Sequence, residues 1–109
     1  MPAPKSNPTA PEGAEAASGR IMVPTVGYDG LNKRRAIRAS RAYVQRCGVS
    51  AKEIRSLRFS AKRVYYLRGR VQRPDDRPYL VVTATGPGAL VGSIAKRLFL
   101  TVSYSYSTQ

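Results

Sequence analysis

The sequence predicts an α+β protein with a disordered N-terminal arm, one or two basic helices, and then a small antiparallel β-sheet of three to four strands. Three observations favour this fold class. Apolar residues recur every three or four positions over residues 31–47, as on the buried side of a helix. From residue 57 the period changes to alternation with β-branched and aromatic residues, which is typical of strands. Residues 1–19 are rich in Pro, Ala, Ser and Gly, a composition that cannot bury enough apolar surface to offset the entropy of ordering.

The chain of 109 residues is long enough for one domain with one modest core. We expect residues 1–19 to form the disordered arm and residues 20–109 a single basic domain. Pro24 interrupts the extended stretch 20–26, which therefore predicts an edge strand or a peptide laid along a surface. Within the domain we expect helical structure over 31–57 and strands at about 58–72, 79–85 and 97–107.

The helix expected over residues 31–47 is the clearest local pattern. Asp29 is suited to cap its start, and Gly48 to end it. Cys47 closes the apolar side, so we expect a small buried thiol there. The apolar side comprises Leu31, Ala36, Ile37, Ser40, Tyr43, Val44 and Cys47.

A second, shorter helix is predicted after Gly48, because Ser50 and Glu53 fit a capping box. The two helices resemble a helix-turn-helix core over residues 43–57, with the glycine at the turn. The structural alternative is a pair of packed helices with no role in reading a DNA groove.

The remaining chain predicts strands. Bases alternate with apolar residues along 58–72, with a bend or bulge at Gly69, so we expect the bases on the open face of that strand. The stretch 79–85 is apolar on both faces and predicts a central strand. We expect residues 86–88, Gly-Pro-Gly, to form a turn rather than a phosphate-binding loop. Strict alternation over 97–107 predicts a long amphipathic strand that closes the sheet.

The charge of the chain is concentrated in residues 33–73, which hold fourteen Lys or Arg and one acid, Glu53. The formal net charge of the whole chain is +13, because the five bases and five acids outside this window cancel. Such a charge density is typical of a polyanion binder. Nucleic acid is the polyanion that we expect, because each phosphate neutralised releases counterions.

We expect RNA or single-stranded DNA to be preferred, with duplex DNA as an alternative. Two adjacent tyrosines beside these bases are suited to stack on unpaired nucleobases. Each feature also has an alternative interpretation without a binding role. In that interpretation the bases form a face that is only solvated, and one tyrosine of the pair belongs to the core while the other lies on the strand surface. The candidate nucleic-acid-binding residues are Lys33, Arg34, Arg35, Arg38, Arg41, Arg46, Lys52, Arg55, Arg58, Lys62, Arg63, Tyr65, Tyr66, Arg68 and Arg70.

Several classes of site are disfavoured. The chain has no His, which excludes a His/Cys zinc site and Ser-His-Asp or Cys-His catalysis. Asp75 and Asp76 are adjacent in a predicted turn and would not converge on one substrate atom. We therefore expect no enzyme, no cofactor and no metal. A single Cys and the lack of an apolar run of ~20 residues favour an intracellular (cytoplasmic) location over secretion or a membrane.

The C-terminal third, from YLVVTAT through a Gly/Pro loop to RLFLTVSYSYSTQ, resembles the final strands of coat proteins of small icosahedral, tombusvirus-like RNA viruses. In that family such a strand closes a jelly-roll sandwich just before a C-terminal Gln. The resemblance implies an RNA-binding structural protein of a virion. The family's N-terminal arm is basic, whereas residues 1–19 here are near neutral.

Our first hypothesis is a non-enzymatic structural protein, of the virion or coat type, that neutralises phosphates of RNA or single-stranded DNA through a basic helix and strand. We expect it to form a homo-oligomer through the C-terminal strand. The alternatives are a helix-turn-helix DNA-binding transcriptional regulator built on residues 43–57, or a ribonucleoprotein subunit.

Overall fold

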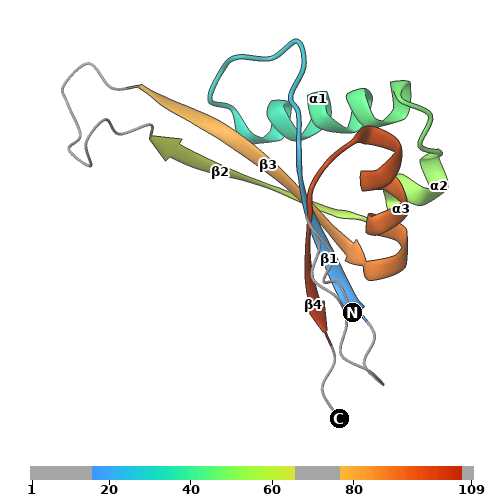
Figure 1. Ribbon diagram of the computed structural model, residues 1–109. Helices are drawn as coiled ribbons and strands as arrows, with labels where there is room; N and C mark the ends of the chain where they lie inside the picture. Colours follow the sequence, from blue (N-terminus) through green and yellow to red (C-terminus); the bar gives the residue numbers. More distant parts are fainter. Residues whose placement is uncertain (1–15, 66–76, 107–109) are drawn as a thin grey trace.

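The protein is seen in a computed structural model that describes residues 16–65 and 77–106. Four strands form one antiparallel sheet in the order β2-β3-β1-β4 (Figure 1). Apart from the short additional helix α2, this order of elements is that of the ferredoxin-like, or split βαβ, arrangement. The α+β prediction is confirmed. The elements are β1 (Ala16–Val23), α1 (Lys33–Arg46), α2 (Ala51–Arg55), β2 (Arg58–Tyr65), β3 (Pro78–Pro87), α3 (Gly88–Leu98) and β4 (Val102–Tyr106).

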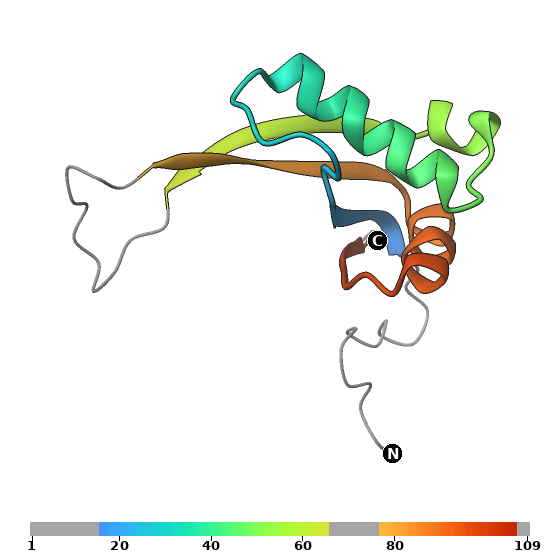
Figure 2. The same ribbon diagram turned by 90° about the horizontal axis from the view of Figure 1, so that it is seen from above.

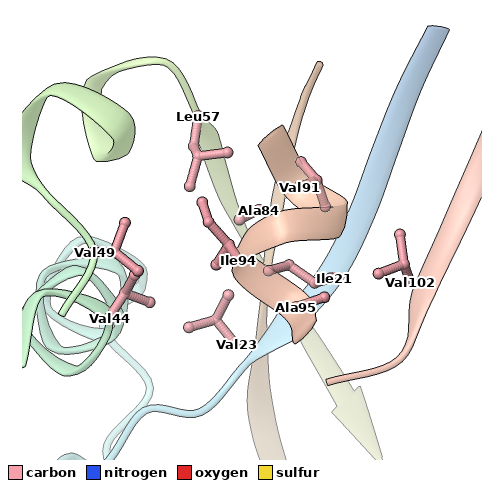
Figure 3. Close-up of a cluster of buried hydrophobic side chains, with 10 residues drawn as sticks. All are labelled: Ile21, Val23, Val44, Val49, Leu57, Ala84, Val91, Ile94, Ala95 and Val102. Carbon is pink, nitrogen blue, oxygen red and sulfur yellow. The ribbon is translucent and has the colours of Figure 1, made fainter. Parts of the chain in front are cut away.

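The core lies between one face of the sheet and the helices α1 and α3 (Figure 3). Alternate residues of each strand point to this face, because the side-chain period of a strand is two. Ile21 on β1 is thus aligned with Ala84 on β3 and with Val102 on β4, and all three are buried. The opposite face of the sheet carries no helix of the described residues, and we call it the open face.

The helix α1 confirms the first predicted helix, with small differences at its ends. Its buried side is Ala36, Ser40 and Val44. Asn32 rather than Asp29 caps the start: the backbone N–H of Arg35 donates to Asn32 Oδ1 at 3.0 Å. A side-chain oxygen at this position satisfies an N–H that has no partner within the helix.

Two residues of the predicted apolar stripe lie outside the core. Leu31 precedes the helix and is 41% exposed, and Cys47 is an exposed free thiol. The prediction of a buried thiol is therefore wrong. Cys47 follows the last residue of α1 as its C-cap, and Gly48 then takes a φ of +100°, which turns the chain away from the helix axis.

The predicted capping box is confirmed. The backbone N–H of Glu53 donates to Ser50 Oγ at 3.2 Å, and the backbone N–H of Ser50 donates to Glu53 Oε1 at 3.0 Å. The helix α2 that follows contains only five residues. It leads through Ser56 and the buried Leu57 into β2.

The first strand differs most from its prediction. It lies between β3 and β4 in the centre of the sheet, and Pro24 ends it instead of placing it at an edge. It begins at Ala16, so residues 16–19 belong to the sheet and not to the predicted arm. Gly19 is buried where α3 crosses β1, and a Cβ at this position would lie 3.0 Å from Val91 Cβ. This close approach requires glycine. The rest of the predicted arm lies outside the described residues.

The second difference is at the predicted turn 86–88 and the start of the predicted strand 97–107: β3 continues to Pro87, and α3 then runs from Gly88 to Leu98. Val91, Ile94 and Ala95 are buried at helical spacing. The helix ends at Phe99, whose φ of 57° is left-handed, and β4 begins only at Val102. Within β4 the predicted alternation is confirmed, with buried Val102 followed by exposed Ser103.

The two strands β2 and β3 agree with the predicted strands in their order and approximate position. The strand β3 is central, as expected, and β2 begins at Arg58 and is described to Tyr65. The remainder of the predicted strand, including Gly69, lies outside the described residues. The hairpin extends away from the helices, and its distal end lies beyond α1 (Figure 2).

Candidate nucleic-acid interface

Two bases of α1, Arg34 and Arg38, lie on the side of the helix that faces away from the sheet. Arg34 and Arg38 are four residues apart, whereas Arg41 lies at the flank of the helix, with its guanidinium over the Phe59 ring of β2. All three are exposed.

The bases of the 33–73 window are gathered on one half of the fold. The helix α1 packs against β2 and β3, whereas α3 packs mainly against β1. Because β2 and β4 are the two edges of the sheet, α1, α2 and β2 lie on the side away from β4. We call their exposed bases the basic half: Lys33, Arg34, Arg35, Arg38, Arg41, Arg46, Lys52, Arg55, Arg58, Lys62 and Arg63. The bases of β1 and α3 are Arg20, Lys96 and Arg97.

The bases of β2 are divided between the two faces of the sheet. Arg58 and Lys62 lie on the open face, as expected, beside Ser60, which shares a hydrogen bond of 2.9 Å with Thr83 Oγ1. Arg63 has the opposite parity and lies on the same face as Phe59. The prediction of one open basic face on this strand therefore holds for Arg58 and Lys62 but not for Arg63.

The last four predicted binding positions in the sequence are Tyr65, Tyr66, Arg68 and Arg70. Tyr65 ends the described part of β2 and is 41% exposed, so its ring is available to stack on a nucleobase. Tyr66, Arg68 and Arg70 lie outside the described residues, and their roles stay predictions.

The single carboxylate of the window does not relieve the repulsion among these bases. Glu53 Oε2 accepts a hydrogen bond of 2.8 Å from Arg97 Nη2, and Glu53 Oε1 accepts from Ser50. The bond from Arg97, followed by the bond from the Ser50 backbone, lowers the pKa of Glu53 below its ordinary value. Over residues 16–65 and 77–106 this is the only ion pair, so no base of the basic half has a carboxylate partner there.

A groove of about 520 Å³ lies within the basic half, at the end of the sheet where β2 begins. Arg41, Arg55 and Arg58 line it, one from each of α1, α2 and β2. The guanidinium carbon of Arg41 lies 5.0 Å from the centre of the Phe59 ring, within the range of a cation–π interaction. Sequence reasoning singled out the three arginines but not their convergence, which depends on how α1 and α2 pack on the sheet.

A second cavity, of about 550 Å³, lies on the open face and differs in chemistry. Its lining includes Met22, Val81 and Phe99, with Arg20 as its one charged residue. Phe99 is 94% exposed. This surface offers apolar contacts but little charge.

Two further findings bear on the disfavoured classes of site. In the described ranges, no group of three or more His, Cys, Asp or Glu side chains is placed to hold a metal ion. None of the helices in those ranges has the length and apolar character needed to cross a membrane. Comparison of the chain with family models, with curated proteins and with solved structures returned no match.

Proposed function

We propose that the protein is a non-enzymatic structural protein that binds RNA or single-stranded DNA through its basic half, without sequence choice. One observation carries this proposal. The bases of three consecutive elements share one half of the fold, and the single acid among them is engaged by Arg97. Like charges at three- and four-residue spacing on α1 repel one another. A phosphate backbone that lies across these bases attracts each of them and so offsets the repulsion.

The distribution of the bases favours backbone contacts over groove reading. They lie on α1, α2 and both faces of β2, rather than on one recognition helix. The helix α2, which a helix-turn-helix regulator would place in the major groove, is five residues long and offers few side chains to base edges. A flexible single strand can follow such a divided surface more easily than a stiff duplex can.

We also propose that copies of the chain associate through β4. This strand is an edge of the sheet and reads VSYSY, without a charge, whereas the other edge strand, β2, carries Arg58, Lys62 and Arg63. Charges on an edge strand oppose pairing with another chain, and an uncharged edge permits it. Pairing through β4 would leave the basic half of each copy free. A role within a virion rests on the resemblance of the C-terminal third alone.

The function is tested by measuring the affinity of the purified protein for single-stranded RNA, single-stranded DNA and duplex DNA of mixed and homopolymeric sequence. We expect similar affinities across sequences, with the single strands bound at least as tightly as the duplex. A preference of roughly a thousand-fold or more for one duplex sequence would instead indicate a regulator.

Association through β4 is tested by Ser105→Lys, with Ser60→Lys on β2 as the matched control. Sedimentation should show that the first substitution reduces self-association and that the second does not. Self-association that survives Ser105→Lys would contradict pairing through this edge.

A further inference from the structure

We propose that the groove lined by Arg41, Arg55 and Arg58 is the site where one phosphate group of the bound strand is held, an inference that rests on the proposed function. The rest of the basic half would then guide the strand on either side of this point. The groove is distinguished from the remaining basic surface by its shape, by the stacking of Arg41 on Phe59 and by the close packing of the α2–β2 connection.

The shape brings arginines from three elements to the lining of one concavity. Arg41 belongs to α1, Arg55 is the last residue of α2, and Arg58 is the first residue of β2. No carboxylate is among the described residues that line the groove. A concave site lined by charge of one sign concentrates counterions more strongly than a convex surface does.

Arg41 is held in place by a partner that leaves its charge intact. Its guanidinium lies over the ring of Phe59, 5.0 Å from the ring centre. An arginine that stacks on an aromatic ring loses less conformational entropy when it binds, and its N–H groups remain free at the edge of the plane. Arg41 is therefore preorganised to donate two parallel hydrogen bonds to phosphate oxygens.

The connection between α2 and β2, which lines the groove, packs closely against β3. Gly86 on β3 lies so close to the α2–β2 connection that a Cβ there would be 2.9 Å from Leu57 Cδ2 and 3.2 Å from the carbonyl oxygen of Ser56. Leu57 is buried in the core. Arg55 and Arg58 flank this anchored connection, so their backbone positions are set before a ligand arrives.

The chemistry of the groove fits a phosphate group better than a carboxylate or a nucleobase. A phosphate offers several acceptor oxygens in a tetrahedral arrangement, and three guanidinium groups offer donors from different directions. The hydroxyl groups of Ser18 and Thr85 also line the groove and can donate to the same oxygens. The phosphate could belong to a polynucleotide or to a small phosphorylated compound, and the two sources can be separated experimentally.

The test compares Arg55→Gln/Arg58→Gln with the control Arg35→Gln/Arg46→Gln, which removes two charges from α1 outside the groove. We expect the groove variant to bind a single-stranded oligonucleotide roughly ten-fold more weakly than the control variant does, since bonds to charged groups are removed. Arg41→Lys keeps the charge but lacks the planar fork, and we expect it to lose more affinity than Arg35→Lys. Thermal unfolding verifies that all variants remain folded.

Nuclear magnetic resonance of the arginine Nε–H groups identifies the ligand. We expect the oligonucleotide to shift the signals of Arg41, Arg55 and Arg58, and excess pyrophosphate to compete with it at the same signals. Equal reductions of affinity in the groove and control variants, with binding retained, would overturn the groove and leave the proposed function intact. Shifts with pyrophosphate but not with the oligonucleotide would assign the groove to a small phosphorylated compound. No binding of any oligonucleotide to the wild-type protein would overturn the proposed function itself.

Discussion

Arg97 on α3 donates a hydrogen bond of 2.8 Å from Nη2 to Oε2 of Glu53 on α2. The same carboxylate caps its own helix through Ser50. Glu53 therefore joins two helices that are distant in sequence, and it fixes α2 beside the groove. The carboxylate of Glu53 therefore links α2 to α3 and does not pair with a base of the basic half.

The pKa of Glu53 predicts how stability depends on pH. The bond from Arg97 lowers the pKa of Glu53 below its ordinary value of 4.5 in the folded state, so this carboxylate stabilises the fold above that value. The stabilisation is lost as the pH falls through the lowered pKa. We expect thermal unfolding of Glu53→Gln to show a flatter dependence on pH from neutrality into the acid range than the wild-type protein shows.

The matched control for that experiment is Asp29→Asn, which changes an exposed acid outside the helices. It should retain the wild-type dependence on acid. Because Glu53 is near the surface, we expect only a modest change in melting temperature. An acid dependence unchanged in Glu53→Gln would show that the bond with Arg97 contributes nothing to folding.

Gly19 should tolerate no side chain. A methyl group there would lie 3.0 Å from Val91 Cβ and 3.3 Å from Val102 Cγ1, both in the core, so α3 would have to move away from β1. We expect Gly19→Ala to lower the free energy of unfolding by about 1–3 kcal/mol, as overpacking does. Denaturant titration measures this change, with Ser18→Ala on the open face as the control. Equal stability of the two variants would contradict the close packing of α3 on β1.

Ser40 should be replaceable with a gain. Its Oγ is buried on the sheet side of α1 and has no hydrogen-bond partner among the described residues. We expect Ser40→Ala to raise the free energy of unfolding by roughly 1 kcal/mol, because the cost of burying an unpaired hydroxyl is removed. Denaturant titration is again the measurement, and a decrease in stability would imply that the hydroxyl has a partner or that its volume is needed.

The local signals that the sequence carries unambiguously are those that satisfy backbone groups or repeat with a fixed period. The capping box of Ser50 and Glu53 and the buried side of α1 are of this kind, and both are confirmed. The exposure of the α1 bases follows from the same period. These features were predictable because they depend on neighbours within one or two helical turns.

The features that sequence reasoning missed depend on partners distant in the chain. Pro24 suggests an edge strand, but β1 ends there and pairs on both sides before it. Gly86 and Gly88 suggest a turn, and for this reason the helix that begins immediately after Pro87 was not predicted. The groove could not be predicted either, since Arg41 and Phe59 meet only when α1 packs on the sheet.

The most direct test of phosphate binding by the basic half is the salt dependence of the affinity for a single-stranded RNA. We compare Arg34→Gln/Arg38→Gln, on the outer side of α1, with Arg20→Gln/Lys96→Gln, which removes the same charge from β1 and α3. If the basic half neutralises phosphates, the slope of the logarithm of affinity against the logarithm of salt concentration should fall in magnitude by roughly 0.7 for each phosphate that the first variant no longer neutralises. The second variant should keep the wild-type slope. Equal slopes in the two variants, or a wild-type slope near zero, would contradict phosphate binding by the basic half.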